Sequence, residues 1–517
     1  MKKTFCYIIM MATLLAACSL DEHPRDQIPQ EKAYTNKEAL YRNAVAMLYS
    51  YIGGNSDGQG LQGTCRGVYD LQTFGSDEAM LPTRGTDWYD GGIWQDMYKH
   101  SWTAGHPIPK NAWLYLYEVI TMCNNSLNVL AQHKEMAGDD YTSWQAEVRA
   151  LRAMYYWYLI DLFGDVPLVT SNDVSMNEVT RTPRADVFNF CVNELEDVLF
   201  DLVDDNSVFE GDYYGRITVP VAMFVLAKLM LNSEVYTGSF NPEYMQNCIN
   251  YCDAIEDRPF RLEFLYGDNF TVTNHSSSEN IFVIPMDKDR YSNQMQNLFR
   301  SYHYRHAAAY GFVGENGTCA TLRALQMYGY DTDDEDPRFE LNYYAGAVCD
   351  LGGDIITDRI GDPLIYYPDK VELDLSDSPY LETAGARMRK YEVDKNAPLD
   401  GKLMDNDIVL FRFADVLLMR AEAKVRLGIS GQEDLDEVRD RVGLEPIDCT
   451  LENLQAERFK EFAWEGWRRQ DMIRFGCYKS LYEGEDAVDE SDGHTSVFPI
   501  PADVRTLNPK LTQNTGY

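Results

Sequence analysis

The sequence predicts a mainly α-helical protein built from tetratricopeptide-like helix pairs, with a large loop-rich region and a few short strands. Three observations support this fold class. Apolar residues recur at the three- and four-residue spacing of helices over much of the chain. Several helical segments follow one another in pairs with short connections, which is typical of helical-repeat packing. Residues 260–405 are instead rich in Gly, Asp, Asn and Tyr.

The clearest helix is predicted over residues 143–163. Apolar residues that include Trp144, Leu151 and Leu162 recur there at helical spacing. Gly164 follows the last of them, which is a common way for a helix to end. Further helices are predicted over residues 36–51, 113–130, 185–202, 218–236, 243–256, 407–427, 432–441 and 454–475.

Consecutive helices are expected to pack in pairs. Small residues such as Ala150, Ala153 and Ala421 allow close contact between helix axes, although no strict sequence period is visible. The predicted pairs are residues 113–130 with 143–163, 185–202 with 218–236, and 409–427 with 432–441.

Residues 260–405 are predicted to be long ordered loops with short strands such as IFVIP at 281–285. Long loops in a compact protein are usually functional or disordered, and the many aromatic residues here favour order. This region is therefore expected to bind the ligand. No clean linker interrupts the chain, so residues 31–517 are predicted to form a single domain.

The first residues are predicted to be a processing signal. The apolar run at 5–15 is too short to cross a bilayer. The sequence LLAAC that follows resembles the lipobox of bacterial lipoproteins. That resemblance implies a signal peptide over residues 1–17 and lipid attachment to Cys18. Residues 18–30 are polar and contain proline, as expected for a flexible tether.

The net charge of −36 restricts the ligand. Such a chain repels phosphate backbones, so no nucleic acid partner is expected, and a neutral ligand is favoured over an acidic polymer. Apart from Cys6 and Cys18, nine scattered cysteines remain, which do not indicate a disulfide framework. Cys248 and Cys252 could pair or bind metal, but are expected to be small buried residues.

Four motifs, in order, resemble those of the SusD-like (RagB/SusD) family. RALRAMYYWYLIDLFGDVPLV at 149–169 resembles its helix followed by GDVP. FRFADVLLMRAEAKVRLG at 411–428 and ERFKEFAWEGWRRQDMIRFG at 457–476 resemble two further family segments. FPIPADVRTLNPKLTQNTGY at 498–517 resembles the family's C-terminal motif. With the lipobox, the resemblance covers nearly the whole chain.

This resemblance implies four tetratricopeptide-like units and a loop-rich region. It also implies glycan binding at the cell surface, together with a SusC-type TonB-dependent outer-membrane transporter, without catalytic activity. No cofactor is expected. The sequence departs from the family pattern at Phe413, Phe475 and Thr515, but these residues bear on details rather than on the fold.

The charged residues of the motifs also have a structural interpretation. They stand at helical spacings and can form ion pairs. They are Glu147, Arg149, Arg152, Arg420, Glu422, Glu465, Arg468 and Asp471.

The segment before residue 93 contains the residue types that sugar binding needs. A sugar offers an apolar C–H face that stacks on Trp or Tyr, and hydroxyls that bond to planar polar groups. SusD-like proteins often carry ligand contacts in the corresponding loop. Trp88 is therefore the first candidate for a glycan contact, followed by Tyr89, Asp70, Asp77 and Arg84.

The late loops supply a second group of candidates. Arg387 could direct its forked donors to sugar hydroxyls or simply pair with a carboxylate, and Tyr310 and Cys319 are weaker candidates. In contrast, Trp94, Tyr98 and Trp102 stand four residues apart, which places them on one face of a helix and favours a core role.

Two alternatives remain open. A surface glycoside hydrolase needs two carboxylates across a sugar bond. Glu461 and Glu465 share a helical face, but the arginines beside them favour salt bridges. The second alternative is a helical-repeat scaffold of the transporter without its own glycan site.

Several catalytic or metal patterns lack their structural context. GNSDG at 54–58 and GQGLQG at 58–63 follow a predicted helix rather than the strand that their mechanisms need. The acidic residues 331–336 lack the glycine and terminal glutamate of a calcium loop. His303 and His306 supply only half of a metal site, so no metal is expected.

Overall fold

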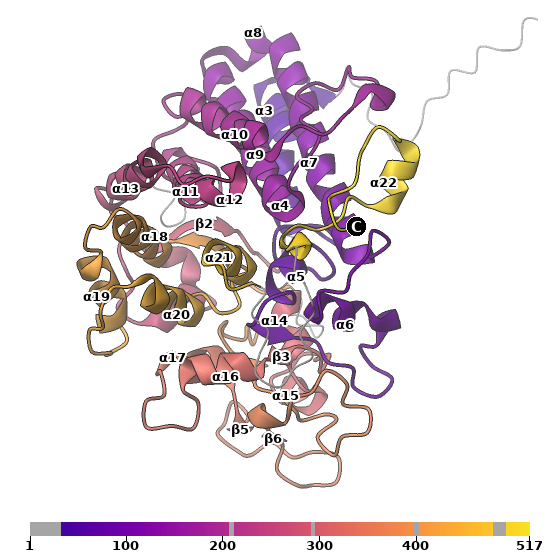
Figure 1. The fold of residues 1–517 in the computed structure, drawn as a ribbon, viewed down its shortest axis with the longest axis vertical. Coiled ribbons are helices and arrows are strands. Elements are labelled where there is room, and N and C mark those ends of the chain that lie inside the picture. The colour runs from indigo at the N-terminus through magenta and orange to yellow at the C-terminus, as the bar shows by residue number, and fades with distance from the viewer. Residues whose placement is uncertain (1–32, 206–210, 291–294, 398–402, 479–492) are drawn as a thin grey trace, which may run out of the picture.

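The computed structural model describes residues 33–205, 211–290, 295–397, 403–478 and 493–517. The predicted signal peptide (1–17), Cys18 and the predicted tether (18–30) lie outside the described residues. The described chain is mainly helical, which confirms the predicted fold class. Helices fill the upper and left parts of Figure 1, and long loops with short strands make up its lower part.

The first half of the chain is a stack of helices, coloured indigo to magenta in Figure 1. Its elements are α3 (Lys37–Tyr41), the π-helical turn η1 (Arg42–Ala46), α4 (Met47–Gly53), α5 (Val68–Thr73), α6 (Ile93–Tyr98), α7 (Pro107–Gln132), α8 (Lys134–Ala137), α9 (Tyr141–Phe163), α10 (Arg184–Val198), α11 (Val219–Leu231), α12 (Ser233–Thr237) and α13 (Pro242–Glu256). Helix α9 ends at Gly164, as predicted, with a φ of +73° that favours glycine.

The helices pack largely as the sequence predicted. Helix α7 packs on α9, which confirms the first predicted pair. The predicted pairing of residues 185–202 with 218–236 is only a minor contact, because α10 packs mainly on α9 and α11 mainly on α13. The C-terminal helices are α18 (Phe413–Arg426), α19 (Gln432–Asp440), α20 (Leu451–Glu461), α21 (Arg468–Arg474) and α22 (Ala502–Leu507). Helix α18 packs on α19, as predicted, and also on α13 and α20.

In the C-terminal part, two predicted helices have different limits in the structure. The helix predicted over 407–427 begins only at Phe413, because the residues before it pair as a strand. The helix predicted over 454–475 is broken into α20 and α21. Between them, Trp464 and Gly466 have φ angles of +67° and +74°, which a right-handed helix does not accommodate.

The loop-rich region is held by short elements. In the described residues, the strands form four two-stranded antiparallel sheets: β1 (Ala79–Met80) with β3 (Cys319–Ala320), β2 (Asn280–Ile284) with β8 (Ile408–Arg412), β4 (Tyr343–Tyr344) with β7 (Arg387–Met388), and β5 (Gly346–Ala347) with β6 (Ile365–Tyr366). The short helices are α14 (Gln296–Ser301), α15 (Tyr304–Ala309), α16 (Leu322–Tyr328) and α17 (Arg338–Asn342). Strand β2 contains most of the predicted IFVIP run.

Single 3-10 turns connect several of these elements. They are η2 (Asp90–Gly92), η3 (Gly138–Asp140), η4 (Met176–Glu178), η5 (Tyr266–Phe270), η6 (Asn274–Ser276), η7 (Pro368–Lys370) and η8 (His494–Ser496).

The aromatic residues of and after α6 are core residues, as predicted. Trp94, Tyr98 and Trp102 are all buried. The prediction that all three share one helical face is wrong for Trp102, because α6 ends at Tyr98 and His100 has a φ of +52°. Trp102 instead reaches the core from the loop that follows, where its indole N–H donates to the hydroxyl of Tyr517 at 2.7 Å.

The described residues lack a membrane-spanning helix, a disulfide and a cluster of metal-ligating residues. None of their helices is long and apolar enough to cross a membrane. Their nine cysteines are free, and Cys248 and Cys252 are both buried in α13. No group of three or more His, Cys, Asp or Glu residues in this part of the chain is placed to hold a metal ion.

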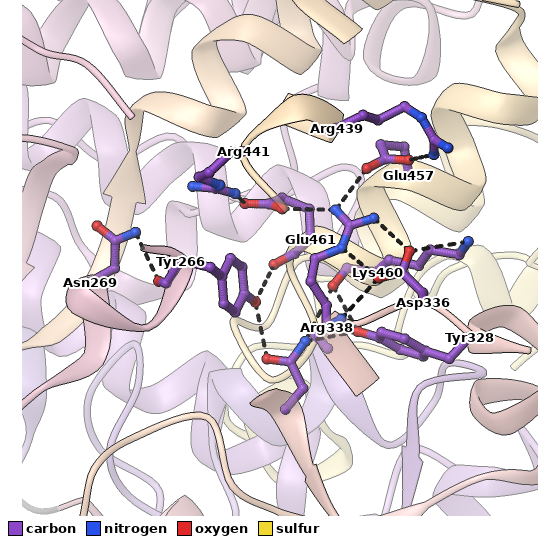
Figure 2. A network of polar contacts seen from close by, with 12 residues as sticks. Tyr266, Asn269, Tyr328, Asp336, Arg338, Arg439, Arg441, Glu457, Lys460 and Glu461 are labelled. Atoms are coloured by element: carbon purple, nitrogen blue, oxygen red, sulfur yellow. Dashed lines mark hydrogen bonds and ion pairs between the residues drawn. The ribbon is translucent and has the colours of Figure 1, made fainter. Parts of the chain in front are cut away.

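A buried set of ion pairs joins the C-terminal helices to the loop-rich region (Figure 2). At its centre is Glu461, the last residue of α20, whose side chain is fully buried. Its Oε1 lies 2.6 Å from Arg412 Nη1 and also pairs with Arg441, and its Oε2 lies 2.9 Å from Arg338 Nη1. Arg338 of α17 also pairs with Asp336. One carboxylate thereby joins guanidinium groups from three separate segments.

The charges of this cluster compensate one another in the interior. Burial alone raises the pKa of the Glu461 carboxyl, but Arg441, Arg412 and Arg338 together lower it well below its usual value. The backbone carbonyl of Glu461 also accepts a 2.9 Å hydrogen bond from the hydroxyl of Tyr266 in the loop-rich region. Removing one partner of a buried ion pair is costly, because it leaves a charge without compensation.

Glu461→Gln is expected to lower the free energy of unfolding by about 3–5 kcal/mol, because buried guanidinium groups lose their carboxylate. Urea unfolding followed by tryptophan fluorescence measures the change. Glu452→Gln, at an exposed position in the first turn of the same helix, is the control and is expected to cost less than about 1 kcal/mol. Equal unfolding midpoints for the two variants would contradict the central role of Glu461.

Glu78 is a buried carboxyl whose pKa is determined mainly by burial. Its Oε1 accepts a 2.6 Å hydrogen bond from the backbone N–H of Trp464, in the turn between α20 and α21. Burial raises the pKa of Glu78 to about 8, and the Trp464 N–H, Lys390 and Arg468 oppose this only in part. The native state therefore holds this proton at pH values where an unfolded chain has already released it.

Glu78→Gln is expected to remove this proton linkage while keeping an acceptor for Trp464. Because the pKa is raised from 4.5 to about 8 on folding, the stability that the Glu78 proton contributes falls as pH rises through that window. The free energy of unfolding of the variant, relative to the unmodified protein, is expected to rise by about 1.4 kcal/mol per pH unit there. Urea unfolding at about pH 5 and about pH 8 measures it. A difference that does not change with pH would show that Glu78 titrates normally.

Candidate functional site

The segment before α6 forms a tight turn. Arg84 and Asp87 are joined by two backbone hydrogen bonds of 2.9 and 3.1 Å. Gly85 within the turn has a φ of +67°, which favours glycine. Trp88 follows with a φ of +62°, a conformation that is unusual for a bulky residue and that is often found at functional positions.

Trp88 is half-buried and held by a loop from a distant part of the chain. Its indole N–H donates a 2.9 Å hydrogen bond to the carbonyl of Glu315. Its ring lies against Gly317, where a Cβ would come within 2.8 Å of the ring. It also meets Trp94 edge-on, with 6.3 Å between ring centroids. These contacts fix the ring while part of it stays open to solvent.

Polar groups and further rings lie beside Trp88. Tyr304, the first residue of α15, donates a 2.7 Å hydrogen bond to the carboxylate of Asp87. Burial and the Asp87 charge raise the pKa of Tyr304 to about 12, so its hydroxyl remains protonated at neutral pH. Tyr89 is 54% exposed. Glu382, whose charge also acts on Tyr304, keeps 40% of its side chain exposed.

We call this surface the Trp88 rim, defined by Asp87, Trp88, Tyr89, Tyr304 and Glu382. Its rings offer flat apolar faces, and its carboxylates offer planar acceptors for hydroxyl groups. This combination suits the C–H face and hydroxyl edge of a sugar. The carboxylates also disfavour an anionic ligand at the same place.

Arg84 was predicted as a ligand contact, and the structure corrects this because the side chain is buried. Its guanidinium donates to the carbonyls of Gly317, Leu381 and Ala384 at 3.3, 2.8 and 2.9 Å. Burial, and then the nearby charge of Arg387, lower its pKa. Arg84 thus ties two loops together behind the Trp88 rim.

Arg387 is likewise fully buried, so it does not offer its donors to a ligand as predicted. It donates to the carbonyls of Ser301 and Glu382 at 3.2 and 3.0 Å. Its guanidinium also lies 5.0 Å from the centroid of the Tyr366 ring. It supports the same loops as Arg84.

Three further predicted contacts are corrected for the same reason. Asp70 is fully buried and lies 2.8 Å from Arg300. Asp77 is buried and accepts a 2.7 Å hydrogen bond from Arg468 Nη2. Cys319 is buried in β3, and burial raises the pKa of its thiol. These side chains belong to the framework, because their polar groups are turned inward and partnered there.

Tyr310 lies at the other end of α15 from Tyr304. It is half-buried, and its hydroxyl donates a 3.2 Å hydrogen bond to the carbonyl of Cys349. It lines a separate pocket rather than the Trp88 rim.

Two residues of the rim that come from outside the Trp88 segment were not predicted. Tyr304 and Glu382 come from the loop-rich region, far from Trp88 in sequence, and no local pattern marks them. The histidines considered for a metal site near them have other partners. His303 Nε2 lies 3.1 Å from Glu382, and His306 Nδ1 lies 3.0 Å from the hydroxyl of Tyr366.

The carboxylate pair and the two glycine motifs that resemble catalytic features are not arranged for catalysis. Glu461 and Glu465 are buried, and both pair with Arg412. The motifs at 54–58 and 58–63 lie in the irregular connection between α4 and α5, so the strand that each mechanism needs is not there.

The motif charges form buried ion pairs between distant segments more often than pairs along one helix. Arg152 pairs with Glu194, and Glu422 pairs with both Arg426 and Arg474. Pairs along one helix are those of Glu422 with Arg426, four residues apart, and of Asp471 with Arg474, three residues apart. The predicted structural role is therefore confirmed, but its partners are mostly long-range.

Comparison with known proteins identifies the fold. The chain is 25% identical to the starch-binding protein SusD of Bacteroides thetaiotaomicron, over the full length of both chains. It is 24% identical to SusD-like protein P25 of Formosa agariphila, over 99% of both. Among solved structures, a laminarin binding SusD-like protein superposes with a TM-score of 0.72 at 21% identity, covering 93% of this chain and 100% of the other.

Surface glycan-binding protein A from Bacteroides thetaiotaomicron, in complex with laminarihexaose, gives a TM-score of 0.71 at 19% identity, over 93% of this chain and 99% of the other. Residues 278–517 match the sequence model of the SusD family. Residues 69–230 match a second model, described as starch-binding associating with outer membrane. The chain belongs to the SusD family.

Proposed function

We propose that this protein is a cell-surface lipoprotein that captures a glycan and delivers it to a SusC-type TonB-dependent transporter. Family membership supports glycan binding, because relatives are named as starch-binding and laminarin-binding proteins. The protein is a binding protein and not an enzyme. Lipid on Cys18, a tether over residues 18–30 and a single domain over 31–517 complete the proposal.

The observation that carries the proposal is the fixed, partly exposed ring of Trp88. Its hydrogen bond to Glu315 and its contact with Gly317 hold it in one orientation before any ligand arrives. A ring that is already ordered loses little conformational entropy on binding. The neighbouring hydroxyl and carboxylate of Tyr304 and Asp87 supply directed polar contacts for sugar hydroxyls.

The charge of the rim indicates the class of glycan. Asp87 and Glu382 place negative charge near Tyr304 at the surface, on a chain whose net charge is −36. Repulsion disfavours uronate-rich or sulfated polysaccharides at this site. A neutral polysaccharide is the ligand that we propose.

Trp88→Ala and Tyr89→Ala are each expected to weaken retention of the protein in native gels that contain the glycan. A panel of starch, laminarin, galactomannan and arabinoxylan identifies the glycan that retards the unmodified protein. Loss of one stacking ring is expected to reduce affinity about tenfold. Phe240→Ala, which removes an exposed ring from the helical part, is the control and is expected to leave retention unchanged.

Because Trp88 is half-buried, a melting curve accompanies each variant. Unchanged retention of both folded variants would contradict the Trp88 rim as the glycan site. Release of reducing sugar by the purified protein would instead favour the glycoside hydrolase alternative.

Cys18→Ser is expected to move the full-length protein from the outer-membrane fraction to the soluble fraction, because the lipid anchor is lost. The unmodified protein is expected to copurify with a SusC-type transporter after mild detergent extraction. Membrane association that survives the substitution would contradict the lipid anchor. Copurification together with indifference to every glycan would select the scaffold alternative.

A further inference from the structure

A pocket of about 580 Å³ lies in the loop-rich region, apart from the Trp88 rim. It is lined by residues of α17, β4 and β5; α17 and β5 are labelled in the lower part of Figure 1. Its lining combines aromatic rings, carboxylates and one guanidinium group. Its volume is within the range of about 300–1,000 Å³ that is typical of small-molecule sites.

The rings of this pocket are held by packing behind them. Tyr310 and Tyr344 both lie against the buried ring of His306, with 4.7 Å between centroids in each case. Tyr330 lies against the buried ring of Phe339, also at 4.7 Å. The three tyrosines are only partly buried, so they present fixed ring faces to the pocket.

Arg389 supplies the cation of the pocket. Its backbone N–H donates a 2.8 Å hydrogen bond to the carbonyl of Asn342, which anchors it beside β4. Its guanidinium lies 5.2 Å from the centroid of the Tyr344 ring. The side chain is exposed, and among the described residues it makes no ion pair or side-chain hydrogen bond. Its donors are therefore available to a ligand.

The carboxylates of the pocket outnumber this cation. Asp331, Glu335, Glu340 and Asp350 all line it. The net charge is negative, which opposes the entry of uronates, sulfates and phosphates. The same carboxylates are planar acceptors for hydroxyl groups.

We propose that this tyrosine pocket, defined by Tyr310, Tyr330, Tyr344, Glu340 and Arg389, is a second glycan subsite that takes an uncharged sugar residue. The sugar ring stacks on a tyrosine face, Arg389 donates to hydroxyls, and Glu340 accepts from them. The inference rests on the proposed function, because it assumes that a glycan is the ligand.

One short helix, α15, connects the tyrosine pocket to the Trp88 rim. Tyr304 of the Trp88 rim begins α15, and Tyr310 of the tyrosine pocket directly follows it. Six residues of helix span about 9 Å along the axis. Two sites joined by one short helix are able to bind different residues of one glycan chain, and binding at two points strengthens retention beyond either alone.

Arg389→Ala is the main test, run on the neutral glycan that retards the unmodified protein. It is expected to reduce affinity about tenfold, because charge-assisted hydrogen bonds are lost. Arg389→Lys keeps the charge but not the planar fork, and is expected to restore little of the loss. Arg42→Ala, which removes an equal charge from an exposed site in the helical stack, is the control. Polygalacturonate, as an anionic probe, is expected not to retard the unmodified protein.

The outcomes separate this inference from the proposed function. Normal retention of Arg389→Ala, together with reduced retention of Trp88→Ala, overturns the tyrosine pocket and keeps the Trp88 rim. Absence of retardation by every glycan overturns both. Stronger retardation by polygalacturonate than by neutral glycans overturns the uncharged class of ligand. Reduced retention of both variants, with a larger loss when they are combined, supports two separate contacts.

Discussion

The buried carboxylate of Glu461 is the constraint on which the arrangement of the loop-rich region depends. It joins Arg338 of α17 to Arg412 of β8 and to Arg441 beyond α19. Loops that carry few regular backbone hydrogen bonds need other partners in the interior. Here those partners are charges, and each works only with its counterparts in place. The C-terminal helices thus hold the loops through specific contacts rather than through apolar packing alone.

The helical part of the fold could be predicted from the sequence because its signals are local. The apolar spacing of α9 and the glycine at its end are visible within one short segment. The break between α20 and α21 could not be predicted, because it is set by tertiary contacts. Trp464 donates its backbone N–H to Glu78, and a Cβ on Gly466 would lie 3.1 Å from the ring of Tyr69. Neither partner is near in sequence.

The same difference between local signals and long-range contacts explains which residues of the site could be predicted. Trp88 and Tyr89 stood out because aromatic rings among turn-forming residues are unusual in one short stretch. Tyr304 and Glu382 did not, since only the folded loops bring them to that stretch. Some polar residues were instead wrongly predicted as contacts. Arg84 and Asp70 are of residue types that bind sugars, but both are buried and have partners inside the protein. Residue type alone does not separate a polar residue that meets a ligand from one that holds a loop.

The bonds of Arg84 have a consequence for how such a surface can diversify. Its guanidinium donates hydrogen bonds to the main-chain carbonyls of Gly317, Leu381 and Ala384. A main-chain carbonyl is present whatever side chain the residue carries. The anchoring is therefore indifferent to side-chain identity at Leu381, and new side chains can be placed on that loop without detaching it. The side chains of the recognition surface can therefore change while the hydrogen bonds that hold its loop are kept.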